Sequence, residues 1–387
     1  MRYNPFNPQM PPRPENFVGR ESELEKFEYN LLQTIHGSPL NMSITGNRGM
    51  GKTAILVKME QIAKKNRCLV FRVSNYESLI ENVTDLTNYL ILGLKNEYIA
   101  TMSVNSKIMQ FGEWASTLKP IITYKDATLS FEEKTITAQT ILRNNFSAFW
   151  EKVKNEYSAV IILVDEAESL DRVNGALSFL REVFQRLSHN SKYMVVLAGK
   201  FNFAERMSES FSPLNRSFPI FPLTPFNESE TNTYITKMLS SVDVTIHSEV
   251  IKKIQEKSEG HPYVVVEMSS LVFNSLQDNE QTITMKHFEN AYPKIIFELE
   301  KDFFNPMFHP VSPKAKAILL KLVQINKKRF LFKEAVKLTG IERKNIAPYI
   351  QELVRKGCLN KPERATYEFF HKLFIDFLEK HAISSEE

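Results

Sequence analysis

The sequence predicts an α/β domain with a parallel sheet, then a small helical domain, then a domain of three helices and a β-hairpin. Three observations predict this order. Short apolar runs alternate with amphipathic stretches over residues 17–226, helical patterns fill residues 227–309, and residues 310–387 read helix, helix, helix, hairpin. The 387 residues are 43% hydrophobic and 24% charged, which is ordinary for a globular chain of two or three domains.

Residues 1–16 read as an extended arm that prolines stiffen. They lack the apolar core of a signal peptide, and no run in the chain approaches the ~18 apolar residues of a transmembrane helix. The two cysteines, Cys68 and Cys358, lie far apart and in no metal-binding spacing. We therefore expect a cytoplasmic protein that makes no membrane contact and needs no disulfide.

Four apolar runs within residues 17–226 predict strands that are buried on both faces. They are Leu40–Thr45, Cys68–Val73, Ala159–Val164 and Tyr193–Ala198. Amphipathic stretches predict the helices on the two sides of this sheet, at Gly51–Lys65, Thr140–Asn155 and Gly175–His189. Residues 101–138 interrupt the alternation with two β-like runs around Lys125 and Asp126, which we interpret as a hairpin insertion.

A phosphate-binding pattern, GxxxxGK[ST], runs from Gly46 to Thr53 between a predicted strand and a predicted helix. Glycines let backbone N–H groups surround a β-phosphate, Lys52 reaches the β and γ oxygens, and the Thr53 hydroxyl binds Mg²⁺. The helix that follows adds the positive end of its dipole. We predict an ATP or ADP site with Mg²⁺ formed by Gly46, Asn47, Arg48, Gly49, Met50, Gly51, Lys52, Thr53 and Ala54.

Two carboxylates, Asp165 and Glu166, follow the apolar strand Ala159–Val164. Phosphoryl transfer to water needs a metal ligand and a general base, and this pair supplies both. Asp165 would hold Mg²⁺, and Glu166 would orient and deprotonate the attacking water. Acids at strand ends are common, but together with the phosphate loop this pair predicts ATP hydrolysis.

With these motifs, most of the chain resembles AAA+ ATPases, in particular the initiator-like (origin-recognition-like) and STAND-like branches of archaea and bacteria. The resemblance implies a P-loop nucleotide-binding domain, a helical lid and a C-terminal winged helix. It places the segment around Val18, Gly19 and Arg20 beside the adenine, together with the arm at Asn4–Phe6. It also implies a residue after the fourth strand that senses the γ-phosphate, where Lys200 stands with Asn202 nearby.

The resemblance also implies an arginine finger at Arg216, with Arg206 as the alternative. A guanidinium there neutralises charge on the γ-phosphate and usually acts on a neighbouring subunit, which implies a homo-oligomer. In the lid, Gly260–Tyr263 resembles the GxP motif of the STAND branch. His261, beside Pro262, either contacts the nucleotide in place of an arginine or caps a helix.

Residues 310–387 have the order of a winged helix-turn-helix, and Ser312 and Pro313 form its first helix start. From Val311 to Glu387 there are 16 basic and 9 acidic side chains, against 33 and 36 in the rest of the chain. This basic excess indicates either an anionic partner or a solvated surface. The residue types that contact phosphates and base edges are Arg343, Lys344, Asn345, Gln351, Arg355, Lys356, Lys361 and Arg364.

We therefore predict an ATPase whose nucleotide state controls oligomeric assembly on double-stranded DNA. The alternative is a STAND-type signalling or scaffold ATPase, in which the winged helix contacts a protein partner. A nucleotide kinase is a weaker third possibility, because it explains neither the Asp165–Glu166 pair nor the appended winged helix.

Overall fold

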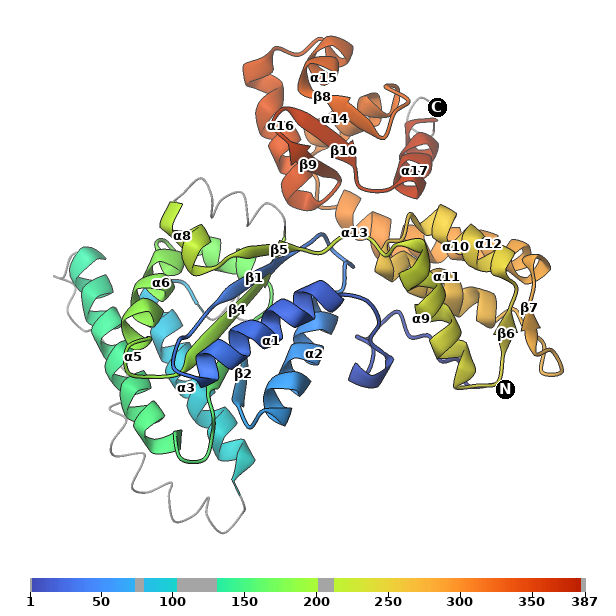
Figure 1. Ribbon diagram of the computed structural model, residues 1–387. Helices are drawn as coiled ribbons and strands as arrows, with labels where there is room; N and C mark the ends of the chain where they lie inside the picture. The colour runs from blue at the N-terminus through green and yellow to red at the C-terminus, as the bar shows by residue number, and fades with distance from the viewer. Residues whose placement is uncertain (1, 74–79, 103–130, 201–211, 384–387) are drawn as a thin grey trace. The chain divides into compact units, whose positions relative to one another are not determined.

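The structure, a computed structural model, describes residues 2–73, 80–102, 131–200 and 212–383 (Figure 1). The chain divides into two compact units. One, which we call the sheet unit, comprises Arg20–Gly46 and Gly51–Thr224. The other, which we call the lid unit, comprises Met1–Gly19, Asn47–Met50 and Pro225–Glu387. The middle of the phosphate loop therefore makes its contacts in the lid unit.

The sheet unit contains a five-stranded parallel sheet with the strand order β2-β3-β4-β1-β5. The strands are β1 (Met42–Thr45), β2 (Leu69–Val73), β3 (Val160–Val164), β4 (Tyr193–Gly199) and β5 (Ile220–Pro222). This confirms the predicted α/β fold and all four predicted strands. The fifth strand, β5, was not predicted, because a run of three residues that ends in proline carries no periodic signal.

Helices cover both faces of this sheet (Figure 1). They are α1 (Glu21–Ile35), α2 (Lys52–Lys65), α3 (Val83–Thr101), α5 (Phe131–Val153) and α6 (Ala176–Leu187), with the short η2 (Ala167–Arg172) and α8 (Ser212–Ser217). Every second residue of β2, such as Leu69 and Phe71, shares a core with α3, α5 and α6. Val70 points to the opposite face of the sheet, because successive side chains of a strand alternate between the faces. It is also buried, because helices cover that face too.

The predicted hairpin insertion at residues 101–138 falls largely on residues 103–130, outside the described ranges. Its last residues, 131–138, form the start of helix α5, so the hairpin does not extend to the predicted boundary at residue 138. Ala138 is buried in the core that α5 shares with α3 and α6.

The lid unit begins with the arm, which includes η1 (Pro14–Asn16), and continues into a helical segment. Its helices are α9 (Glu228–Ser240), α10 (Ser248–Ser258), α11 (Pro262–Phe273), α12 (Met285–Leu299), the π-helical η3 (Glu300–Phe304) and α13 (Asn305–Phe308). Two short strands, β6 (Thr245–Ile246) and β7 (Thr282–Ile283), pair in parallel.

The C-terminal part of the lid unit combines four helices with a small antiparallel sheet of order β8-β10-β9. Its elements are α14 (Pro313–Val323), β8 (Arg329–Leu331), α15 (Phe332–Thr339), α16 (Arg343–Lys356), β9 (Leu359–Glu363), β10 (Thr366–Phe369) and α17 (Lys372–Ile383). Throughout the described ranges, no helix is both long enough and apolar enough to cross a membrane.

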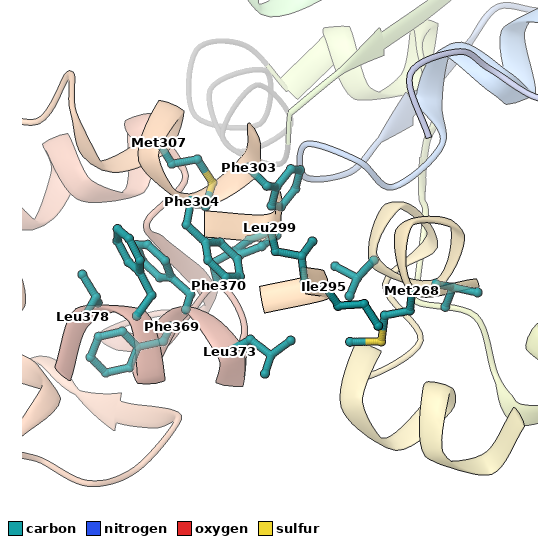
Figure 2. Packing of buried hydrophobic residues seen from close by; sticks show 14 of the residues in the cluster. Met268, Ile295, Leu299, Phe303, Phe304, Met307, Phe369, Phe370, Leu373 and Leu378 are labelled. Atoms are coloured by element: carbon teal, nitrogen blue, oxygen red, sulfur yellow. The ribbon is translucent and has the colours of Figure 1, made fainter. Parts of the chain in front are cut away.

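One hydrophobic core runs through the helical segment and the C-terminal part of the lid unit. Figure 2 shows its side chains extending from Met268 through Ile295 and Leu299 to Phe304 and Phe370. Residues 227–309 and 310–387, which the sequence predicts as two domains, thus form a single compact unit with the arm.

The arm is fixed to the helical segment by polar and aromatic contacts. Asn4 Nδ2 donates to Ser270 O at 3.0 Å and to Asn274 Oδ1 at 2.8 Å. The Phe6 ring is buried against Tyr234 and Phe273. The arm is therefore an integral part of the lid unit.

Candidate nucleotide-binding site

The phosphate loop connects β1 to α2 through two glycines in the left-handed region, Gly49 at φ +78° and Gly51 at φ +88°. Glycine adopts this conformation without the steric cost of a Cβ. Lys52 Nζ donates to Gly46 O at 2.8 Å, so the ammonium group lies over the loop. Burial lowers the pKa of Lys52, while the carboxylates of Glu168 and Asp165 oppose that change.

The two residues predicted to hold Mg²⁺ are in direct contact. The Thr53 hydroxyl, in the first turn of α2, donates to Asp165 Oδ2 at 2.8 Å. Asp165 follows β3 and is 7% exposed. Its other oxygen, Oδ1, accepts the Glu166 N–H at 3.0 Å. A hydroxyl and a carboxylate oxygen are thus side by side at the carboxyl edge of the sheet, and both are ligands that Mg²⁺ prefers.

Glu166, the predicted general base, has an exposed side chain and a left-handed backbone with φ +52°. This conformation is uncommon for a residue with a Cβ and costs about 1–2 kcal/mol. Strained residues of this kind cluster at functional sites, where the surrounding structure holds them in place.

Lys200, at the end of β4, pairs with a residue that the sequence analysis missed. Its Nζ lies 3.3 Å from Glu168 Oε1, and its backbone N–H donates to Glu168 Oε2 at 3.2 Å. The site therefore contains a third carboxylate, which the motif does not include.

Arg72 on β2 was also missed. Its guanidinium lies 3.9 Å from Asp165 Oδ2 and 3.9 Å from Glu60 Oε2. As the one charged residue in the run Cys68–Val73, it could have been recognised from the sequence.

The middle of the phosphate loop contacts the turn that precedes α11. His261 Nε2 donates to Arg48 O at 3.0 Å, and the Tyr263 N–H donates to Gly49 O at 3.2 Å. His261 occupies the N-cap position of α11, but its side chain makes no capping hydrogen bond, and Pro262 is the first helical residue. Of the two roles weighed for His261, capping is not seen, because its side chain contacts the loop backbone instead. A contact with the nucleotide stays a prediction.

Gly49 allows this close approach. A Cβ at Gly49 would lie 2.6 Å from His261 Cε1 and 2.8 Å from Tyr263 Cβ. Two further contacts come from residues that were not predicted. Asn47 Nδ2 donates to Asn360 Oδ1 at 2.8 Å, and the Arg48 guanidinium carbon lies 5.5 Å from the Phe303 ring centroid. Because Asn47 and Asn360 are 313 positions apart, no local sequence pattern could indicate their contact.

The segment predicted to lie beside the adenine is divided between the two units. Val18 packs on the core of the lid unit, and Gly19 has φ +76°, with the Glu230 carboxylate 2.7 Å from where a Cβ would be. Arg20, with φ +69°, is buried immediately before α1 in the sheet unit. Ala54 lies in the first turn of α2.

Arg216, the predicted arginine finger, is exposed on the short helix α8. Its exposure leaves the guanidinium accessible to another molecule. The alternative Arg206 lies outside the described residues, as does Asn202.

The predicted DNA-contacting residues lie on α16 and the β9–β10 hairpin. Ile346, Ile350 and Leu353 are fully buried, which confirms the apolar stripe expected on one side of α16. The exposed candidates are Arg343, Lys344, Asn345, Gln351, Arg355 and Arg364. Lys356 and Lys361 are half-buried.

Comparison with known proteins agrees with this site. Residues 16–197 match the protein family described as AAA ATPase domain. The matched residues include the phosphate loop and the Asp165–Glu166 pair.

Two solved structures share the fold over nearly the whole chain. The ORC2 protein of Aeropyrum pernix, in ADPNP-ADP complexes, is 14% identical, with a TM-score of 0.58 and coverage of 100% of this chain and 98% of that one. A Walker-type ATPase of Pyrococcus abyssi is 18% identical, with a TM-score of 0.56 and coverage of 95% and 97%.

A similar protein is an uncharacterized HTH-type transcriptional regulator of Methanocaldococcus jannaschii, 24% identical over 285 residues. The match covers 69% of this chain but 66% of that protein, so a part of the relative has no counterpart in the match.

Proposed function

We propose that this protein binds ATP with Mg²⁺ and hydrolyses it, and that its nucleotide state controls oligomeric assembly on double-stranded DNA. The observation that carries the ATPase proposal is the 2.8 Å hydrogen bond from Thr53 to Asp165, directly beside Lys52. Residues 112 positions apart meet with the two oxygen types that a nucleotide-bound Mg²⁺ requires.

The roles of the site residues follow from their chemistry. Mg²⁺ keeps several waters and is usually held by one or two protein oxygens together with the phosphates, which suits Thr53 and Asp165. Lys52 would neutralise the β and γ oxygens, and Glu166 would orient the attacking water and accept its proton. Arg216 would complete the site of a neighbouring copy, where its guanidinium stabilises charge on the γ-phosphate.

The proposal of DNA binding rests on the exposed face of α16. Arg343, Lys344 and Arg355 extend from a helix whose opposite side is buried, in a segment with a clear basic excess. We interpret residues 310–387 as a winged helix-turn-helix with α16 as the recognition helix. The Methanocaldococcus jannaschii relative, named an HTH-type transcriptional regulator, supports this interpretation.

The shared core of the lid unit favours a second candidate function, a STAND-type scaffold ATPase. In that case, residues 310–387 would act as a clamp on the lid and contact a protein partner. Phe304 packs against Phe374 and Phe377, as a clamp requires. The two candidates differ in whether duplex DNA changes ATP turnover.

The test is steady-state ATP hydrolysis with and without duplex DNA, at low and moderate salt, with Lys52→Ala as the control. We expect Lys52→Ala to weaken ATP binding by about tenfold to 100-fold, because a hydrogen-bonded charge is lost. Stimulation by DNA that declines with salt supports DNA binding, since counterion release drives it. A rate of ATP hydrolysis that DNA does not change supports the scaffold function. No hydrolysis at all contradicts the ATPase proposal.

A further inference from the structure

The carbonyl groups in the middle of the phosphate loop face the lid unit. Arg48 O accepts from His261, and Gly49 O accepts from Tyr263. In a planar trans peptide the N–H points opposite to the C=O. The N–H group of Gly49 therefore points away from these lid partners, as does that of Met50, which donates to Asn47 O within the loop. Backbone N–H groups on the inner side of such a loop bind phosphate. The lid contacts thus hold the loop in a shape that suits an anion.

Asn47 fixes the first turn of the same loop. Its carbonyl accepts the Met50 N–H at 3.3 Å, and its side-chain amide donates to Asn360 Oδ1 at 2.8 Å. Asn47 and Asn360 are both half-buried, so water competes only partly for this hydrogen bond. Asn360 lies on β9, opposite Glu368 of β10.

The β9–β10 hairpin is also tied to the turn that holds Arg48 and Gly49. Lys328 Nζ lies 3.4 Å from Glu368 Oε1 and donates to Glu259 Oε2 at 2.8 Å. Glu259 stands two residues before His261 and also accepts the Lys372 N–H at 3.1 Å. The hairpin and the His261 turn are therefore held in one arrangement around the loop.

We propose that Asn360 is a positioning residue of the nucleotide site. It orients Asn47 and thereby stabilises the phosphate-binding shape of the loop. The inference rests on the proposed function, because it assumes that this loop binds a nucleoside diphosphate or triphosphate. By linkage, a partner that draws Asn360 away from Asn47 lowers nucleotide affinity, and nucleotide weakens the binding of that partner by the same factor.

A double-mutant cycle tests this role in the full chain. The affinity for ADP with Mg²⁺ is measured by calorimetry for the wild type, Asn360→Ala, Asn47→Ala and the double variant. We expect Asn360→Ala to weaken binding by about threefold to tenfold, the range for one hydrogen bond. In the Asn47→Ala background the same change has no effect, because the bond is already absent. A general structural role for Asn360 would weaken binding in both backgrounds.

Glu363→Ala, an exposed change on the same strand β9, serves as the matched control and leaves affinity unchanged. Thermal melting of each variant checks that the fold is intact. An equal effect of Asn360→Ala in both backgrounds, or no effect in either, overturns the positioning role. Failure of the wild type itself to bind ADP, with Lys52→Ala indistinguishable from it, overturns the proposed function instead.

Discussion

Glu166 has a backbone conformation that is uncommon for a residue with a Cβ. Its backbone is left-handed and its carboxylate is exposed, one position after the buried Asp165. Adjacent acids in a regular strand would point to opposite faces of the sheet. The strand has ended at Glu166, so the side chains of Asp165 and Glu166 no longer have to point to opposite faces. Both carboxylates can then lie at the carboxyl edge of the sheet.

We expect Glu166→Gln to bind ATP as the wild type does but to lose turnover by about 10²- to 10⁴-fold, the usual contribution of a general base. Glutamine keeps the shape and the hydrogen-bonding oxygen but accepts no proton. Phosphate release and ATP affinity, measured on the same preparation, separate the two effects. Glu151→Gln, an exposed change on α5, is the matched control. Turnover within a few-fold of the wild type would exclude Glu166 as the base.

At this scale the sequence was informative where the chemistry requires a contiguous pattern. Lys52, Thr53 and Asp165 were predicted because phosphate and metal binding restrict residue type and spacing together. Glu168 and Asn360 were not predicted, because each acts through a contact that only the folded chain brings about. A short motif cannot contain such information.

Among the elements, helix α11 contains an unusual buried acid, Glu267. The side chain is 8% exposed, and burial raises its pKa to about 7, with the nearby charges of Glu298 and Asp302 acting in the same direction. Lys301 opposes this shift in part. The folded state therefore holds a proton on Glu267 at pH values where the unfolded chain has lost it.

This shift makes the stability of the lid unit depend on pH. Because the folded pKa is raised, the free energy of unfolding falls as pH rises from about 4.5 to about 7, and above that range the full penalty is present. We expect Glu267→Gln to remove the penalty and to stabilise the protein by about 1–3 kcal/mol at pH 8. Urea unfolding at pH 5 and pH 8 measures the difference between the variant and the wild type. An equal difference at both pH values would refute a titrating Glu267.

Elements were predictable in proportion to their length and periodicity. The strands β3 and β4 read correctly as continuous apolar runs, because helices cover both of their faces. The three-residue strands β5 and β8 gave no pattern of their own. The first residues of α5 were assigned to the insertion and not to the helix, because their burial against α3 and α6 depends on residues distant in sequence.

For the whole molecule, the main departure from expectation is the single core of the lid unit. The sequence suggests a boundary near residue 310, where Ser312 and Pro313 begin a helix. Across that boundary, Phe304 packs on Phe374, and Met307 O accepts from Cys358 Sγ at 3.6 Å. The helix start at Ser312 and Pro313 therefore predicted the helix α14 correctly, but the hydrophobic core continues across residue 310.

We expect a chain truncated to residues 1–309 to lose the cooperative unfolding of its lid helices. Removing residues 310–387 exposes Phe303, Phe304 and Met307, at a cost of about 1.5–3 kcal/mol for each side chain. Circular dichroism with heating measures the loss. Trp150 is buried in the core of the sheet unit, so a change in tryptophan emission reports unfolding of that unit. A truncated chain that melts as sharply as the full one would show that residues 227–309 fold alone.

The contacts of the arm also determine when, during translation, the arm can take its native place. Asn4 is translated 266 residues before Ser270, the partner of its amide. At ~5–20 residues per second, the arm waits about 13–50 seconds on the ribosome before its binding surface exists. During that time Phe6 lacks its native neighbours Tyr234 and Phe273 and is open to chaperones. The sheet unit, which ends at Thr224, has all of its chain before Ser270 is made. Completion of the lid unit is therefore a step in which residues of the arm join residues that are translated much later.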